Sequence, residues 1–201
     1  MSSGDRRAPS PTERRVLDAV RSCCERWGIE KVTVDDIARE SGVSRATLYR
    51  LFPGGKDVMF DALRVREIDE FFAELEGHLA DAADLEGLLV RAITASTAAL
   101  RDDEHLAIMM ATEPGSIVSE LTVEGLPRII SMAAESLMPY VEQFIPVEQA
   151  RPVIDLVVRL VISFFLSPSP DLDLADPASA RAYMTPLIDA AVAAARTAST
   201  H

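Results

Sequence analysis

Apolar residues recur at helical spacing along most of this 201-residue chain, and the pattern predicts α-helices. In the first segment, from Pro11 to Trp27, the apolar side chains share one face, and Gly28 is a signal that ends the helix. That face carries Val16, Val20, Cys23, Cys24 and Trp27. The best short β-like run is Val32–Val34, but a helix start follows it at once. Since no strand pair is convincing, we predict an all-α fold.

The pattern divides the chain into about nine expected helices. They span residues 11–27, 34–41, 45–52, 56–79, 85–100, 104–112, 128–144, 152–166 and 177–198. Pro139 and Pro186 lie inside two of them and predict a bend or an interruption, because proline lacks a backbone donor. Residues 113–127 are weakly patterned, and Pro114-Gly115 is expected to stop the preceding helix. This segment is therefore expected to be either a mobile lid or a plain loop.

Residues 33–52 have the arrangement of a helix-turn-helix. Thr33 and Ser44 are the expected N-caps of two short helices, and Gly42 stands where the chain must turn sharply between them. Ala38 is small enough to let the second helix pass closely. The shared interior is expected to hold Ile37, Val43, Leu48 and Leu51. Taken alone, the pattern also fits an ordinary helical hairpin inside a core.

The run from Thr33 to Phe52, followed by Lys56, closely resembles the TetR family of bacterial transcription regulators. The matching residues are Ile37-Ala38, Gly42-Val43-Ser44, Thr47-Leu48-Tyr49, Phe52 and a following lysine. The resemblance covers residues 12–65, and it implies DNA binding here and a divergent remainder that binds an inducer and dimerises. One departure is the loop Pro53-Gly54-Gly55, which has three residues where the family usually has two. Lys56 is therefore expected to sit slightly differently.

The second short helix can be oriented from its own residues. Leu48 faces the interior, so a rotation of about 100° per residue places Ala46 and Arg50 on the opposite side. Thr47 and Tyr49 then lie on the flanks. Arg45 projects from the first turn, where its guanidinium can pair bidentately with guanine in the major groove. This side of the helix is the predicted DNA-reading surface.

The remaining predicted contacts follow from side-chain chemistry. Ala46 permits close approach to the groove floor, and Thr47 can touch a thymine methyl or a phosphate. Tyr49, Thr33 and Lys56 match the phosphate contacts that the resemblance implies. The helix N-termini at Thr33 and Ser44 add backbone donors. The predicted DNA-binding set is Thr33, Ser44, Arg45, Ala46, Thr47, Tyr49, Arg50 and Lys56, although Arg50 is equally compatible with a solvated surface charge.

Charge is distributed unevenly along the chain. The net charge is −12, yet residues 1–56 hold 11 basic and 8 acidic residues, a net of +3. Residues 57–201 hold the other 9 basic and 24 acidic residues, a net of −15. Only the first part is therefore suited to a polyanion. We predict a DNA-binding domain over 1–56 and an effector-binding and dimerisation domain over 57–201, which helix 56–79 connects.

The segment Val153–Leu166 is apolar on nearly every face, which indicates a helix covered from all sides. A subunit interface is the preferred interpretation, together with residues 177–195, and the deep core of the monomer is the alternative. The interface prediction names Val153, Val157, Leu160, Val161 and Phe164.

An effector pocket is expected among the middle helices, where the resemblance implies one. The candidates to line it are Phe72, Ile93, Met109, Met110, Glu113 and Tyr140. Methionine adapts to ligands of variable shape, whereas the carboxylate and the phenol would supply polar contacts. Apolar side chains of this kind are more often plain core residues, which is the favoured alternative for each of them.

Several functional classes are disfavoured by what the sequence lacks. It shows no signal peptide, no apolar run long enough for a membrane helix, and only two cysteines, so we expect a cytoplasmic protein. No catalytic or metal motif is found, and neither enzyme activity nor a cofactor is expected. The favoured function is a homodimeric repressor that a small hydrophobic effector releases from a palindromic operator. The alternative is an effector-independent architectural or activating DNA-binding protein.

Overall fold

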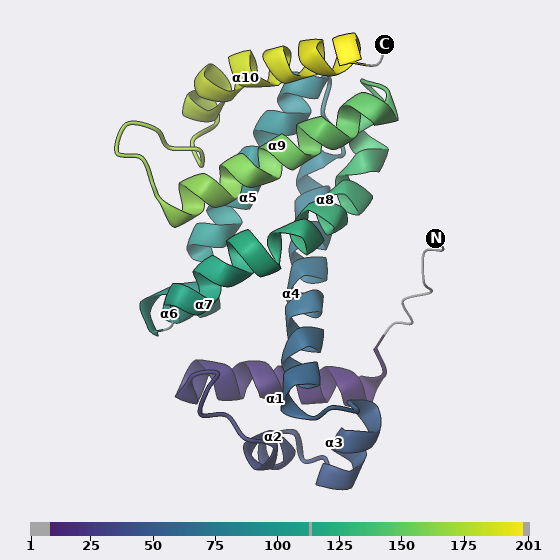
Figure 1. The fold of residues 1–201 in the computed structure, drawn as a ribbon, viewed down its shortest axis with the longest axis vertical. Helices are drawn as coiled ribbons and strands as arrows, with labels where there is room; N and C mark the ends of the chain where they lie inside the picture. Colours follow the sequence, from purple (N-terminus) through teal and green to yellow (C-terminus); the bar gives the residue numbers. More distant parts are fainter. Residues whose placement is uncertain (1–8, 113, 199–201) are drawn as a thin grey trace. The chain divides into compact units, whose positions relative to one another are not determined.

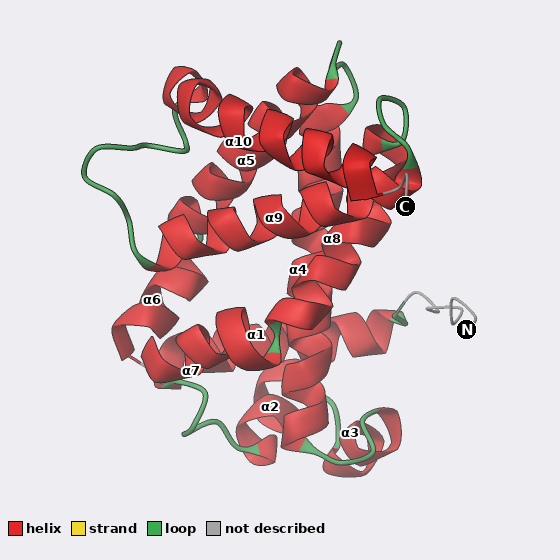
Figure 2. Ribbon diagram, turned by 45° about the horizontal axis from the view of Figure 1, so that its top comes forward, coloured by secondary structure: helices red, strands yellow, loops and turns green. Residues whose placement is uncertain are grey.

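The computed structural model describes residues 9–112 and 114–198, which form ten α-helices, one π-helical turn and no strand (Figures 1 and 2). The elements are α1 Pro11–Trp27, α2 Val34–Ser41, α3 Arg45–Leu51, α4 Lys56–Leu79, α5 Leu85–Asp102, α6 Glu104–Thr112, α7 Pro114–Ser119, η1 Glu120–Glu124, α8 Leu126–Val141, α9 Val147–Leu166 and α10 Pro177–Ala198. The all-α prediction is confirmed. Within these ranges, no helix is both long and apolar enough to cross a membrane.

The helices form two compact units that divide within α4, after Glu67. We call the described residues up to Glu67 unit 1 and those from Ile68 onward unit 2. The division thus lies inside the helix that the sequence analysis treats as a connector.

Unit 1 consists of α1, α2, α3 and the first part of α4. Its core contains side chains from all four helices, including the fully buried Val20, Ile37, Leu48 and Met59. Two ion pairs join α1 to α4: Arg21 to Glu67 at 3.0 Å and Arg66 to Asp18 at 2.7 Å. Unit 1 therefore holds α2 and α3 on a base formed by two longer helices.

In unit 2, α9 packs against α5, α8 and α10 (Figure 1). Its core includes Leu89 and Ile93 of α5, Ile154 of α9 and Met184 of α10, each almost fully buried. Pro139, Pro152 and Pro186 lie inside α8, α9 and α10, none of which is interrupted there. The helix expected to begin at Pro152 begins at Val147, because the buried Ala150 packs the additional turn against the core.

The expectation of a plain loop over 113–127 is wrong for the described part of that segment. Residues from Pro114 onward form α7, which continues through η1 towards α8. The sequence analysis interprets Pro114-Gly115 as a stop, but proline is well tolerated at the first position of a helix, where its missing N–H has no partner to lose. Glu113 lies outside the described residues.

Candidate nucleic-acid interface

The turn between α2 and α3 is built on one glycine. Gly42 adopts a left-handed conformation with φ of 64°, a region that side chains with a Cβ rarely enter. The hydroxyl of buried Ser41 donates to the Ile37 carbonyl oxygen at 2.6 Å and accepts from the Val43 N–H at 3.3 Å. The turn is therefore fixed from both sides, and it sets the direction in which α3 leaves.

Helix α3 presents the face that the sequence predicts. Leu48 is fully buried, whereas Arg45, Ala46, Tyr49 and Arg50 are exposed. Thr47 is half-buried on the flank. A seven-residue helix with one buried anchor and a mostly exposed opposite side has a face that a partner can reach.

Arg45, the predicted base reader, has a partner in the unbound protein. Its guanidinium forms an ion pair with Asp35 in the first turn of α2. The arginine side chain is 64% exposed and the aspartate 47%, so solvent screens the attraction and the pair is weak. The contact orients the guanidinium at the N-terminus of α3, and a stronger partner can displace Asp35.

The hydroxyls of Thr33 and Ser44 serve as helix caps. Thr33 accepts the N–H of Asp36 at 3.3 Å, and the Asp36 carboxylate accepts the N–H of Thr33 at 3.1 Å. The Thr33 hydroxyl also donates to that carboxylate, which together with the backbone bond holds the pKa of Asp36 below its ordinary value. Ser44 accepts the N–H of Thr47 at 3.3 Å and donates to its hydroxyl at 3.0 Å. Both predicted contacts therefore lie at capped helix starts.

The structure gives Lys56 a different role from the predicted phosphate contact. Its ammonium donates to the carbonyl oxygens of Ile29 and Glu30, at 3.4 and 3.3 Å, and lies 5.3 Å from the centre of the Phe60 ring. The lysine thus fastens the loop after α1 to the start of α4. The ammonium has three N–H donors, so one of them remains for a phosphate.

The three-residue loop before Lys56 supports the exposed Tyr49 ring. Gly54 and Gly55 have φ values of 121° and 74°, which favour glycine at both positions. A Cβ on Gly55 would lie 3.1 Å from the Tyr49 ring, so the ring rests directly against this backbone. The loop of residues 53–55 therefore contacts the Tyr49 ring and directly precedes Lys56.

Other arginines of unit 1 are engaged within the protein. Arg26 pairs with Glu40 at 3.5 Å and Arg39 pairs with Asp36 at 3.2 Å. Arg50 is exposed, and among the described residues no ion pair is found for it. Arg50 is thus a positive charge on α3 that needs no exchange of partners to meet a phosphate.

The adjacent Cys23 and Cys24 are buried and form no disulfide. Burial raises the pKa of the Cys23 thiol, and the carboxylates of Glu40 and Asp36 raise it further. A buried thiol kept in its protonated form is a poor nucleophile. The pair therefore acts as small apolar residues in the core of unit 1.

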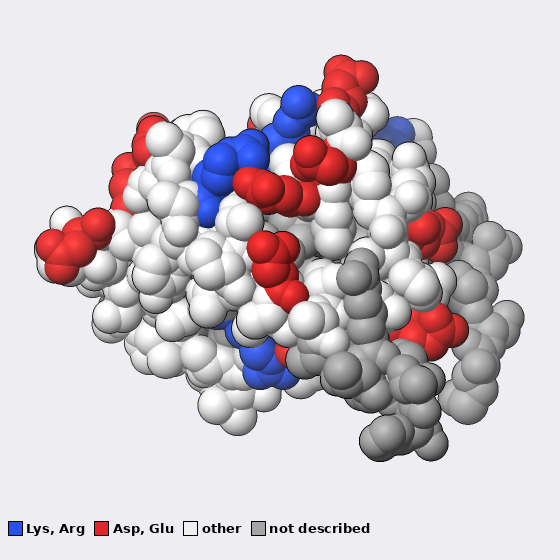
Figure 3. Space-filling model, turned by 90° about the horizontal axis from the view of Figure 1, so that it is seen from above, with Lys and Arg blue, Asp and Glu red and all other residues white. Residues whose placement is uncertain are grey.

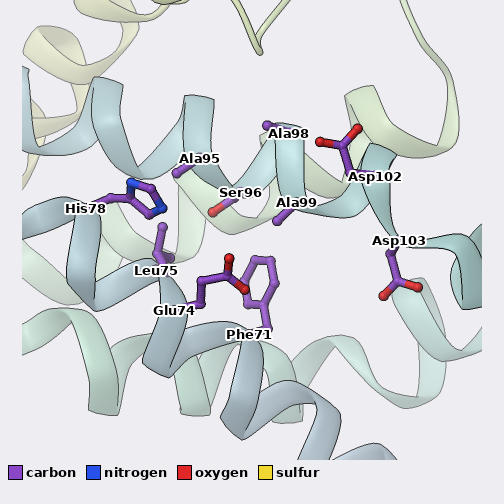
Figure 4. Close-up of a pocket in the computed structure, with 10 residues that line it drawn as sticks. All are labelled: Phe71, Glu74, Leu75, His78, Ala95, Ser96, Ala98, Ala99, Asp102 and Asp103. Atoms are coloured by element: carbon purple, nitrogen blue, oxygen red, sulfur yellow. The ribbon is translucent and has the colours of Figure 1, made fainter. Parts of the chain in front are cut away.

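The predicted pocket residues of unit 2 differ in their burial, and Glu113 lies outside the described residues. Phe72, Ile93 and Met109 are buried in the monomer, while Met110 and Tyr140 are half-buried. The structure has a half-open cavity of about 440 Å³ between the second half of α4 and α5 (Figure 4). None of the predicted residues lines it. The sequence analysis missed this cavity, although Phe71, Glu74 and His78 recur at helical spacing opposite a run of alanines in α5.

The predicted interface residues of α9 divide into two groups. Val153, Val157 and Val161 are at most 6% exposed and belong to the core of their own chain, so they are not available to a partner. Here the monomer-core alternative is correct, because α5, α8 and α10 cover that side of α9. Leu160 and Phe164 are half-buried and keep an accessible edge.

Charged side chains of both signs lie on the face seen from the α10 end, and several acidic ones have no basic neighbour there (Figure 3). Arg181 pairs with Glu86 and Arg101 pairs with Asp173. Some of the nine basic residues after residue 56 are thus paired with carboxylates of the same chain. The 24 acidic residues of that part outnumber them, so unpaired negative charge remains.

Comparison with known proteins places this arrangement in a family. The family model described as "Bacterial regulatory proteins, tetR family" matches residues 16–63. An uncharacterized HTH-type transcriptional regulator of Mycobacterium tuberculosis is 32% identical over 133 residues, covering 62% of this chain and 68% of that protein. A second regulator of that description and organism is 27% identical over 184 residues, covering 92% of this chain and 89% of that protein.

Two solved structures share the fold over most of the chain. The TetR family repressor AlkX from a Dietzia strain, implicated in biodegradation of n-alkanes, has a TM-score of 0.67 and 26% identity, with coverage of 91% of this chain and 97% of that chain. The transcriptional repressor QsdR of R. erythropolis has a TM-score of 0.59 and 16% identity, with coverage of 90% and 94%. The second likeness concerns the fold alone.

Proposed function

Because the chain belongs to the TetR family of bacterial regulatory proteins, we propose that it is a cytoplasmic, homodimeric transcriptional repressor. In this proposal the dimer binds a near-palindromic operator, and a small hydrophobic molecule releases it. The observation that carries the proposal is the exposed face of α3. Arg45, Ala46, Tyr49 and Arg50 form this face, and the buried Leu48 anchors the helix from behind.

Each exposed residue of α3 has a chemical role in the proposed complex. Arg45 leaves Asp35 and pairs with guanine in the major groove, while Ala46 allows the helix to come close to the base edges. Tyr49 and Arg50 contact the sugar-phosphate backbone, which gives affinity without sequence information. Thr47, on the flank, contacts a thymine methyl or a phosphate.

A surface on α9 and α10 supports the proposed dimer. Phe164 stacks edge-on against Tyr183, with ring centres 6.0 Å apart. Tyr183 is 47% exposed and Leu187, one turn further along α10, is 39% exposed. Together with Leu160 they form an apolar stripe of half-buried and exposed side chains, which we call the α9–α10 stripe. A second copy of the chain would cover the α9–α10 stripe. The two-fold symmetry of such a dimer would explain why the proposed operator is palindromic.

Effector control requires a ligand that prefers the conformation unable to bind DNA. AlkX, with which the chain shares 26% identity over 91% of its length, is a repressor implicated in biodegradation of n-alkanes. That relationship supports both repression and an apolar effector. The architectural or activating alternative differs in having no such ligand, so ligand-induced loss of DNA binding separates the two.

The test begins with selection of bound sequences from a random duplex library, followed by anisotropy titration of the selected duplex. We expect an inverted repeat and an affinity that falls steeply with salt, because each phosphate contact releases a counterion. Arg45→Ala should lose selectivity. Arg91→Ala is the matched control, since it removes an exposed arginine of unit 2 and should leave binding unchanged. Equal affinity for the selected and scrambled duplexes would contradict the proposal.

A further inference from the structure

The cavity between α4 and α5 combines an apolar interior with an acidic rim (Figure 4). Phe71 and Leu75 of α4 supply one wall, and methyl side chains such as those of Ala95 and Ala99 form the other. Because alanines fill so little of the space between the helices, about 440 Å³ remains. That volume lies within the range of small-molecule sites, which is about 300–1,000 Å³.

The charges around this cavity are of one sign. Its ten lining residues include the carboxylates of Glu74, Asp102 and Asp103 and the imidazole of His78, but neither lysine nor arginine. Arg101, which directly precedes Asp102 in the sequence, forms an ion pair with Asp173. Asp103 accepts the N–H of Leu106 at 2.9 Å, whereas the described residues offer no ion pair to Glu74. The carboxylate of Glu74 points to the centre of the cavity beside the Phe71 ring (Figure 4).

A buried hydroxyl on the opposite wall is the second observation that indicates a ligand. Ser96 is only 9% exposed, and its oxygen points into the cavity towards α4 (Figure 4). Its neighbours Thr94 and Thr97 donate to helix carbonyls, at 3.0 Å to Val90 and 2.7 Å to Ile93. Among the described residues, no hydrogen-bond partner is found for Ser96. Because the Ser96 oxygen faces the cavity, this hydroxyl is available to a molecule bound there.

We propose that this cavity binds an organic cation with an apolar body, such as a primary alkylammonium. The ammonium donates to the Glu74 carboxylate and to the Ser96 oxygen and lies near the Phe71 ring, while the alkyl chain packs between Leu75 and the alanines. An anion would meet three carboxylates and neither lysine nor arginine. A neutral molecule would cover the Glu74 carboxylate without compensating its lost hydration. As an effector site, the cavity rests on the proposed function, and it specifies the chemical class of that effector.

Calorimetric titration with three probes of equal chain length tests the charge preference without DNA. We expect n-octylammonium to bind at least about tenfold more tightly than n-octanol, because a charge-assisted hydrogen bond is stronger than a neutral one, and octanoate not to bind measurably. All three are used below their micelle concentrations. Octanol or octanoate binding as tightly as octylammonium would overturn the inference.

Two variants and a matched control localise the site. Glu74→Gln removes one charge from an exposed side chain and should weaken octylammonium binding about tenfold while leaving octanol unchanged. Ser96→Ala should weaken it by a smaller factor. Glu76→Gln makes the same change on α4 at a residue that does not line the cavity, and it should have no effect. An equal loss in the two glutamine variants would show that overall charge, and not this site, attracts the cation.

A separate anisotropy measurement on the selected duplex distinguishes this inference from the proposed function. Octylammonium that binds through Glu74 yet leaves DNA bound supports the cation site and contradicts effector release by it. DNA release by octanol but not by octylammonium supports a hydrophobic effector and overturns the cation preference. Release by octylammonium that Glu74→Gln abolishes supports both.

Discussion

Helices α3 and α9 show how differently the two units use apolar residues. Helix α3 has seven residues and buries only Leu48 completely, so its remaining side chains stay accessible. Helix α9 has 20 residues and is mostly apolar from Val153 onward, yet Val153, Val157 and Val161 are buried within their own chain. A polar helix face therefore indicates a surface that solvent or a partner can reach. An apolar face does not show whether it is buried in the core of its own chain or in an interface with a partner chain.

The sharpest test of this contrast replaces two apolar residues of unit 2 by glutamate. Val157→Glu should lower the free energy of unfolding by about 3 kcal/mol or more, because it buries a charge without a partner. Leu187→Glu, in the exposed α9–α10 stripe, should instead give folded monomers. Thermal unfolding and sedimentation velocity measure the two effects.

Val123→Glu is the matched control for these variants, since Val123 is 79% exposed on η1 and outside the stripe. It should remain folded and keep its oligomeric state. A folded, fully dimeric Leu187→Glu protein would remove the stripe from the interface.

The second prediction concerns the exposed face of α3. Arg45→Ala should cost about 1–3 kcal/mol at the selected duplex and relax preference at one base pair in each half-site. Tyr49→Phe should weaken selected and scrambled duplexes by similar factors, because a phosphate contact carries no sequence information. Titration against single-base changes of the selected duplex gives both results. The reverse outcome would show that α3 lies in the groove in another orientation.

Asp35→Asn refines the same experiment. Removing the carboxylate frees Arg45 from its ion pair and reduces repulsion of phosphates, so affinity should rise for all duplexes. A fall in selectivity would additionally show that Asp35 orients the arginine.

The third prediction concerns two glycines, one in each unit, whose replacement by alanine should change the stability in opposite directions. Gly42→Ala should destabilise unit 1 by about 1–2 kcal/mol, because the left-handed backbone is strained for alanine although no atom obstructs its Cβ. Gly77→Ala, also in open space but inside α4, should stabilise the protein by about 0.5–1 kcal/mol. Chemical denaturation measures both. Equal effects would show that the Gly42 conformation is not what holds the turn.

The smallest expected effect is the pH dependence of the α2 cap. The lowered pKa of Asp36 means that its carboxylate stabilises the fold above its ordinary pKa. This contribution is lost as the pH falls through the lower, folded pKa. Asp36→Asn should therefore flatten the stability profile below about pH 4, as thermal unfolding between pH 3 and 6 would show. An unchanged slope would mean that other carboxylates account for the acid sensitivity.

The predictions that agree with the structure concern positions where one local requirement selects the residue type. Gly42 must accept a positive φ, Thr33 and Ser44 must cap helices, and Leu48 must be the anchor of a short amphipathic helix. These requirements depend on neighbours within a few residues. The α3 face and the all-α fold could therefore be predicted directly.

Packing between distant elements decided the rest. Whether Val157 meets its own core or a partner depends on where α5, α8 and α10 lie. Lys56 donates to the carbonyl oxygen of Glu30, which is 26 residues earlier in the chain. Arg45 forms an ion pair with Asp35 of the preceding helix. The cavity exists because alanines of α5 face Phe71 and Glu74 of α4, a pairing that no local pattern determines. By itself the sequence determined most of the helices and the exposed face of α3, because those follow from spacing along one chain segment. Only the tertiary structure decided the cavity and the buried face of α9, because both depend on which helices meet.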